Sequence, residues 1–168
     1  MAIHVVDYDP EWPSRFREIV GELEPLLADL HPVFHHVGST SVPGLAAKPK
    51  IDLHAAFANA DPLADAIERV QSLGAFIFHG DKYKQQTWTF TSGKGSHGAR
   101  LYLCSADNAV LRDRITFRDY LRSHPERAKA YAALKLKLMG EANDDWDYYT
   151  GGKSDFVLET LRLASEGR

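Results

Sequence analysis

Hydrophobic residues recur at helical spacing over the first thirty positions and give way to strand-like runs in the middle of the chain. From Asp9 to Leu30, apolar side chains return every three or four residues, which predicts an amphipathic helix that begins at Asp9-Pro10. Pro25 falls inside this stretch and is expected to kink the helix. Runs typical of strands follow at residues 33–37 and 51–57.

The rest of the chain predicts one more helix among strands and then helices alone. A helix is expected from Asp61-Pro62 to Gly74, followed by strands at 75–79, 85–91 and 100–104, the last two joined by a turn at 93–98. Beyond them, helices are predicted at 109–122, 125–139 and 154–164, with 148–152 as a linker. The expected fold is therefore α+β: a small mixed β-sheet with helices on one side and a helical C-terminal third.

The composition is that of one ordinary globular domain. The 168 residues are 44% hydrophobic and 26% charged, so residues 1–168 are predicted to form a single domain with a full core. The formal net charge of −3 provides no general attraction to nucleic acid or to an anionic membrane, and neither is predicted as a partner. The single cysteine, the absence of a secretory pattern and the absence of a long apolar run predict a cytoplasmic location.

A glycine-serine turn is followed by an acidic residue inside a strand. Gly38, Ser39 and Thr40 come directly after the strand at 33–37, and Asp52 lies between two aliphatic residues. A carboxylate among aliphatic side chains is costly unless a partner compensates it. The amides of such a turn can form a concavity for an anion, and Lys48 is close enough in sequence to reach a phosphate. The pattern indicates either a metal-nucleotide site or a serine-rich turn beside a locally capping aspartate.

Three arginines share one face of the helix predicted at 109–122. Arg114, Arg118 and Arg122 are spaced by four residues. Like charges at that spacing repel each other by about 0.2–0.5 kcal/mol per pair, and an anionic ligand would relieve the repulsion. Among the three, Arg118 is the candidate for a phosphate contact. The alternative is a solvated, charged helix face.

A long run resembles the signature of a known family. Residues 36–53, HVGSTSVPGLAAKPKIDL, are similar to the signature of the GrpB family, which belongs to the nucleotidyltransferase superfamily with a DNA polymerase beta-like fold. The resemblance continues at 117–125, at 131–135, and at Tyr149 with 153–156, so it covers nearly the whole chain. The same family also occurs as a domain fused to some bacterial dephospho-CoA kinases.

The resemblance implies a site for a metal ion and a triphosphate. In it, Asp52 holds Mg²⁺ or Mn²⁺ and Lys48 assists catalysis, while the phosphates are bound by a wider set of residues: Gly38, Ser39, Thr40, Arg118, Lys135 and Lys153. Where the superfamily has a second acid, this chain has His54, and the later strand at 100–103 has no acid at all. His54 is therefore a second metal ligand, a base, or a buried neutral histidine.

The implied activity is that of a nucleotidyltransferase-like protein. It would bind a Mg-nucleoside triphosphate and transfer a nucleotidyl group to an unidentified small acceptor. One carboxylate, together with phosphate oxygens and waters, is enough to hold a single Mg²⁺. The alternative is a non-catalytic nucleotide- or phosphate-binding module that has lost transfer, and the missing second acid favours it.

Overall fold

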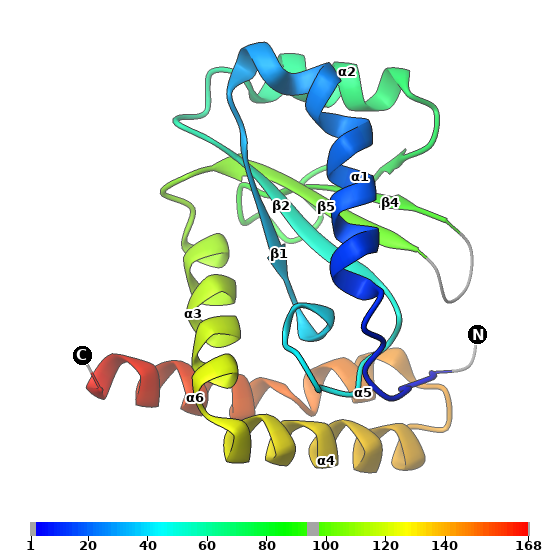
Figure 1. Ribbon diagram of the computed structural model, residues 1–168, viewed down its shortest axis with the longest axis vertical. Coiled ribbons are helices and arrows are strands. Elements are labelled where there is room, and N and C mark those ends of the chain that lie inside the picture. Colours follow the sequence, from blue (N-terminus) through cyan, green and yellow to red (C-terminus); the bar gives the residue numbers. More distant parts are fainter. Residues whose placement is uncertain (1–2, 94–97, 168) are drawn as a thin grey trace.

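A five-stranded mixed sheet forms the centre of the molecule (Figure 1). The computed structural model describes residues 3–93 and 98–167. The strand order is β1-β2-β5-β4-β3; β2 and β5 run parallel, and the other neighbours are antiparallel. The strands are β1 (Val33–Val37), β2 (Ile51–Phe57), β3 (Ile77–Phe78), β4 (Trp88–Ser92) and β5 (Ala99–Ser105).

Two helices cover one face of this sheet. Helix α1 (Trp12–Leu27) continues as a 3-10 turn at Ala28–Leu30, and α2 (Leu63–Ser72) lies across its end. Alternate residues of β2 are apolar, and they pack with both helices in the main hydrophobic core. Pro25 lies inside α1 and removes one helical hydrogen bond, and only two residues of the helix follow it.

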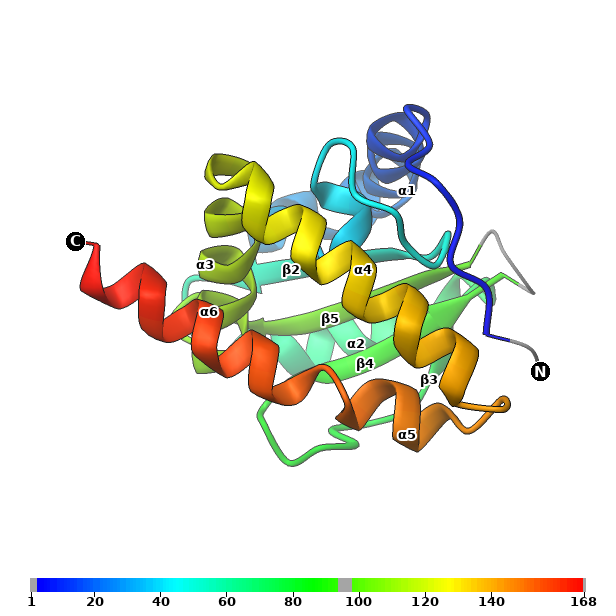
Figure 2. The same ribbon diagram turned by 90° about the horizontal axis from the view of Figure 1, so that it is seen from below.

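The helical last third lies against the opposite face and one end of the sheet (Figure 2). Helix α3 (Ala109–Ser123) begins at Asn108, whose side chain accepts hydrogen bonds from the amides of Val110 and Leu111. Leu111 of this helix packs against Cys104 of β5 and so joins α3 to the sheet. The remaining helices are α4 (Pro125–Glu141), α5 (Trp146–Gly151) and α6 (Ser154–Glu166). The predicted α+β architecture, a small mixed sheet with a helical C-terminal third, is thus confirmed. The prediction that helices lie on one side of the sheet is wrong, because α1 and α2 cover one face and α3 packs on the other.

One predicted linker is wrong. Residues 148–152 were expected to be irregular, but most of them belong to α5. Asp145 caps that helix by accepting hydrogen bonds from the amides of Asp147 and Tyr148, and Tyr149 is buried within it. The strand predicted at 75–79 shortens to β3, and most of the turn predicted at 93–98 lies outside the described residues. Over 3–93 and 98–167, no helix combines the length and the apolarity that a membrane crossing requires.

The pairing of β2 places its polar residues on the side of the C-terminal helices. Asp52 lies opposite Arg100 of β5, and His54 lies opposite Tyr102. Because side chains alternate along a strand, these two pairs face away from the α1 side of the sheet. The loop between β1 and β2 extends from the sheet toward α4 and α5 (Figure 1). The candidate site therefore lies between this loop, the edge of β2 and β5, and the last helices.

Candidate functional site

The Asp52 carboxylate lies directly against the bend at Gly38. Gly38 has φ of 73°, and a Cβ atom placed on it would approach Oδ2 of Asp52 to 2.8 Å. Val37, the residue before it, is the β1 partner of Asp52 across the antiparallel ladder. Neighbouring strands therefore bring together the turn and the carboxylate, as the sequence predicts. Glycine is required here because it combines a left-handed conformation with the absence of a side chain.

One oxygen of this carboxylate has no hydrogen-bond partner. Among the described residues, Oδ1 of Asp52 is buried and receives no hydrogen bond. The nearest cation is Nη1 of Arg100 at 3.9 Å, a distance longer than a hydrogen bond. A buried carboxylate oxygen without a donor costs free energy, which a bound cation would recover. The whole side chain is 29% exposed, so the carboxylate borders the solvent-accessible surface, and this surface beside Asp52 is called the opening.

Three lysines from separate parts of the chain lie close enough to repel one another and are called the lysine cluster: Lys48, Lys135 and Lys153. Two of them, Lys48 and Lys153, also interact with the charge of Asp52. Nζ of Lys48 lies 4.4 Å from the ring centre of Trp146 and 4.7 Å from that of Tyr149. Nζ of Lys153 lies 4.2 Å from the ring centre of Tyr149. Aromatic faces attract cations, so these rings hold two ammonium groups that would otherwise separate.

Burial lowers the pKa of each lysine in the cluster. It lowers the pKa of Lys48 to about 8, although Asp52 opposes the shift. Lys153 falls to a pKa of about 8, first through burial and then through the charge of Lys48. Lys135 is only 2% exposed, and burial, with repulsion from Lys153 and Lys48, lowers its pKa to about 7. A group of cations this poorly solvated favours the binding of an anion.

The lysines differ in how directly they reach the opening. Nζ of Lys135 donates a hydrogen bond to the carbonyl of Ala46 and lies 4.7 Å from the Tyr131 ring. In this conformation it acts on a bound anion through its charge and not by contact. Lys48 and Lys153 are half-buried and keep part of their surface at the opening. The structure thus brings Lys48, Lys135 and Lys153 close to one another, with Lys48 and Lys153 near Asp52; their binding of phosphate stays a prediction.

The hydroxyl groups of the turn have different surroundings. Oγ1 of Thr40 lies 3.0 Å from Nε2 of His36, and Thr40 is 2% exposed. The hydroxyl of Ser41 donates to the carbonyl of Gly38 at 2.5 Å. Ser39 is half-buried and hydrogen-bonds the Tyr131 side chain. Of the predicted phosphate-binding hydroxyls, only Ser39 is therefore placed at the opening, while Thr40 stabilises the turn from inside.

The arginines of α3 hold the backbone of the turn. Nη1 of Arg118 donates to the carbonyl of His36 at 2.9 Å, and its Nε donates to Asp119 at 2.7 Å. Arg122 donates twice to the carbonyl of Ser41, at 2.9 and 2.7 Å. The charges that act on Lys48 are those of Asp52, Arg100 and Lys50, whereas Arg118 acts on His35 and His36. The structure thus gives Arg118 a positioning role at the turn.

His54 is completely buried, and both of its ring nitrogens have partners. Nδ1 lies 3.3 Å from Sγ of Cys104, and Nε2 lies 2.9 Å from Nη1 of Arg114. Because arginine only donates hydrogen bonds, Nε2 accepts and the ring is neutral. Burial, followed by the charge of Arg114, lowers the pKa of His54 to about 2. The geometry favours the buried neutral histidine, because both ring nitrogens already have partners and neither is free for a metal ion.

The donor set fits one metal ion but not two. Over the residues that the structure describes, no group of three or more His, Cys, Asp or Glu side chains gathers around a common point. The unpaired oxygen of Asp52 suits a single Mg²⁺ or Mn²⁺ whose other ligands are phosphate oxygens and waters. On the β5 side of Asp52 the facing residue is Arg100, whose positive charge disfavours a second ion.

Two features of the site were missed from the sequence. Arg100 faces Asp52 only because β2 pairs in parallel with β5, which is far from it in the chain. Trp146 contributes a ring to the lysine cluster because Asp145 starts a helix there. The alternation of Arg100 with Tyr102 in a predicted strand was a usable signal for the first. No sequence signal pointed to the second.

Substituting Gly38 with alanine tests the contact between the turn and Asp52. We expect Gly38→Ala to lower the free energy of unfolding by about 2 kcal/mol, because the new Cβ meets Oδ2 and the residue must keep a positive φ. The measurement is urea denaturation. Gly21→Ala is the matched control: it lies inside α1 with no atom within 4 Å of an added Cβ, so it should stabilise slightly. Equal effects of both substitutions would contradict the contact.

Comparison with known proteins identifies relatives over nearly the full length. A family model described as GrpB protein matches residues 2–162. The UPF0157 protein YqkA of Bacillus subtilis is 28% identical over 155 residues, covering 92% of this chain and 45% of YqkA. The chain thus spans less than half the length of that relative. A dephospho-CoA kinase of Mycolicibacterium paratuberculosis is 26% identical over 187 residues, covering 96% of this chain and 46% of the kinase.

Solved structures show the same fold. The crystal structure of GrpB from Enterococcus faecalis matches with a TM-score of 0.87 and 27% identity, covering 98% of each chain. The structure of the GLD-2/RNP-8 complex matches with a TM-score of 0.61 and 14% identity, over 94% of this chain and 60% of the other. The second likeness is one of fold alone, and that fold is nucleotidyltransferase-like.

Proposed function

This chain belongs to the GrpB protein family, and on that premise we propose that it binds a nucleoside triphosphate with one Mg²⁺ or Mn²⁺ and transfers a nucleotidyl group to a small acceptor. The observation that carries the proposal is the unpaired Oδ1 of Asp52, on a carboxylate that lies against the Gly38 bend and interacts with the charges of Lys48 and Lys153. A carboxylate for a metal ion and cations for phosphate oxygens are thereby gathered at one opening.

Each residue has a role that follows from its position. Asp52 would hold the ion, which when bound neutralises phosphate charge and makes an acceptor hydroxyl more acidic. Lys48 and Lys153 compensate the charge of the polyphosphate at the opening, and Lys135 adds to the potential from behind. Ser39 offers its hydroxyl to a phosphate oxygen.

The turn is held in position before any ligand binds. Arg122 and Arg118 bind carbonyl groups on either side of Gly38, and Ser41 closes the bend by donating to Gly38 itself. A preorganised turn can receive a phosphate without the cost of ordering a loop. This rigidity of the turn supports the proposed binding of a polyphosphate.

A second candidate function is binding without transfer. The single carboxylate and the cation opposite it favour this alternative, because the transfer of a nucleotidyl group commonly uses a pair of metal ions. Such a module would keep the affinity for nucleotide or free phosphate chains and release no product. The two functions differ in chemistry and not in the residues that bind the ligand.

The test combines a binding measurement with a product measurement. We expect calorimetric titration to detect binding of a non-hydrolysable nucleoside triphosphate in the presence of Mg²⁺, and of inorganic tripolyphosphate, with sulfate as the control for general anion binding. Pyrophosphate release is then followed with each nucleoside triphosphate, Mg²⁺ or Mn²⁺, and small hydroxyl-bearing acceptors. Binding with release supports transfer, and binding without release supports the second candidate. No binding of either polyphosphate overturns both.

A further inference from the structure

Arg100 lies beside Asp52 at the candidate site. It is the register partner of Asp52 on β5, and its Nη1 lies 3.9 Å from Oδ1. Its side chain is 42% exposed, so the guanidinium reaches the same opening as the carboxylate. The side chain of Tyr102, two residues along the strand, forms a hydrogen bond with it.

Tyr102 is itself held firmly. Its side chain is 3% exposed, and its ring stacks on that of His54 with 4.8 Å between the ring centres. Arg114 of α3 places its guanidinium carbon 4.0 Å from the Tyr102 ring centre. A guanidinium bound to such a fixed phenol has little freedom to move away. Arg100 is therefore a permanent, oriented positive charge at the opening of the site.

The carboxylate that faces Arg100 accepts no hydrogen bond from its guanidinium group. That carboxylate is Asp52, at a distance too long for a hydrogen bond, and the nearby cations are Lys48, Lys50 and Lys153. Several cations around one carboxylate suit a ligand that carries several negative charges. A planar guanidinium can also bind two phosphate oxygens through a pair of parallel N–H groups, a fixed geometry that a lysine ammonium does not have.

We propose that Arg100 supplies, on the β5 side of Asp52, the positive charge that a second metal ion would supply, so that the site binds a polyphosphate chain even when no divalent cation is present. This inference rests on the proposed function and names its ligand class: a chain of linked phosphates, free or attached to a nucleoside. The guanidinium faces oxygens of the chain, while the oxygen of Asp52 stays available for one metal ion.

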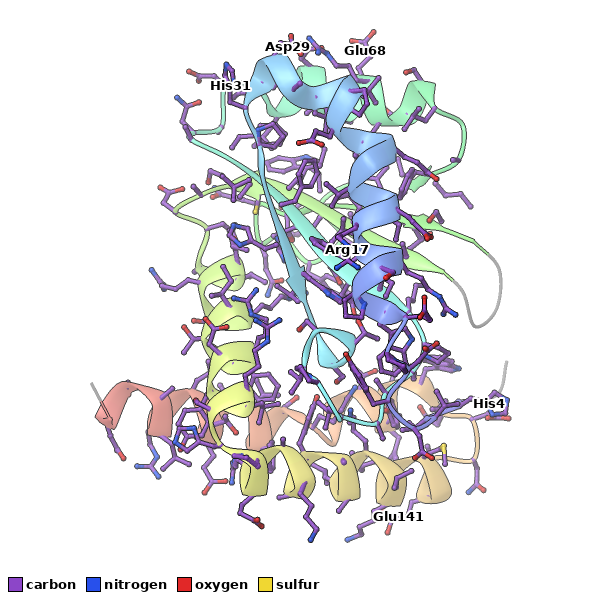
Figure 3. The ribbon with its side chains drawn as sticks, viewed as in Figure 1. His4, Arg17, Asp29, His31, Glu68 and Glu141 are labelled. Carbon is purple, nitrogen blue, oxygen red and sulfur yellow. The ribbon has the colours of Figure 1, made fainter. Side chains whose placement is uncertain are left out.

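The test is calorimetric titration with inorganic tripolyphosphate, in EDTA and in Mg²⁺. The wild-type chain should bind in EDTA with an affinity within about tenfold of that in Mg²⁺. Arg100→Gln should weaken binding in EDTA by about tenfold or more, because one bidentate charge-assisted contact is lost. Arg100→Lys keeps the charge without the planar fork and should fall between the two. The control is Arg17→Gln, an exposed arginine on α1 (Figure 3), which should leave the affinity unchanged.

The outcomes separate this inference from the function on which it rests. Binding in Mg²⁺ but none in EDTA overturns the inference and leaves the proposed function standing. Equal affinities of the wild-type chain, Arg100→Gln and Arg100→Lys in EDTA also overturn it. The absence of tripolyphosphate binding under either condition overturns the proposed function itself. If circular dichroism shows that Arg100→Gln is unfolded, the comparison of Arg100→Lys with the wild-type chain decides in the same way.

Discussion

Replacing Lys135 with methionine should stabilise the protein at pH 7 and weaken its binding of polyphosphate. Lys135 is 2% exposed, and burial lowers its pKa to about 7, so the fold bears the cost of keeping an ammonium group out of water. Methionine has a similar length and carries no charge. After subtracting the lost hydrogen bond to Ala46, we expect the free energy of unfolding to rise by about 2 kcal/mol.

The pH dependence follows from the direction of the pKa shift. The pKa of Lys135 is about 7 in the folded chain, against an ordinary value of 10.5. Between these two values the unfolded chain binds more protons than the folded chain, so stability rises with pH over this range. Below pH 7 both states are protonated and the full cost is present. The advantage of Lys135→Met should therefore be largest at pH 7 and smaller at pH 9.5.

Urea denaturation at the two pH values measures this difference. The matched control is Lys137→Met, because Lys137 lies on the same helix, and its side chain is 70% exposed and near Glu141. Lys137→Met should change neither the stability at pH 7 nor its dependence on pH by more than about 0.5 kcal/mol. A loss of stability in Lys135→Met at pH 7 would show that its contacts outweigh the cost of its charge.

The same substitution should weaken binding of inorganic tripolyphosphate in EDTA by about tenfold at pH 7. The reason is electrostatic, since Lys135 lies behind the opening and acts on the ligand through the field it shares with Lys48 and Lys153. Calorimetric titration measures the change, again against Lys137→Met. Stability and affinity would then move in opposite directions, as expected when unfavourable burial is retained for a binding site.

Much of the fold could be predicted because its signals are local. The bounds of β1 and β2 match the expected runs, since each is a short stretch of strand-forming residues between proline or glycine and a turn. The helix at α5 could not be predicted in this way. Its sequence of tyrosines, threonine and glycine has low helix propensity, and what stabilises it is the Asp145 cap and the burial of Tyr149.

The site divides along the same line. Gly38 directly follows β1 and Asp52 lies in β2, the next strand along the chain, so their meeting at the bend could be predicted from the chain alone. The role of Arg118 could not, because an arginine spaced for phosphate binding is equally able to satisfy carbonyl groups of a turn. For Arg100, the alternation with Tyr102 in a predicted strand indicates a shared strand face, but its position opposite Asp52 depends on a strand pairing across a long stretch of chain.

Asp52→Asn should have opposite effects on binding and on chemistry. In the wild-type chain the negative charge of Asp52 lies near Arg100, Lys48 and Lys153. Asparagine keeps the shape of the side chain and removes this charge. Binding of tripolyphosphate in EDTA should therefore strengthen by about tenfold. In Mg²⁺ the affinity should become the same as in EDTA, because the ligand for the metal ion is gone. Pyrophosphate release should fall by about 1,000-fold or more.

Calorimetric titration of the variant in EDTA and in Mg²⁺ measures the binding effects, and a pyrophosphate assay measures the chemistry. Asp113→Asn, at an exposed position of α3, is the control for the loss of one negative charge and should behave as the wild-type chain does. A response to Mg²⁺ that survives in Asp52→Asn would place the metal ion away from Asp52. Weaker binding in EDTA would mean that the carboxylate orients the cations around it more than it repels the ligand, and the electrostatic account of this site would then be wrong.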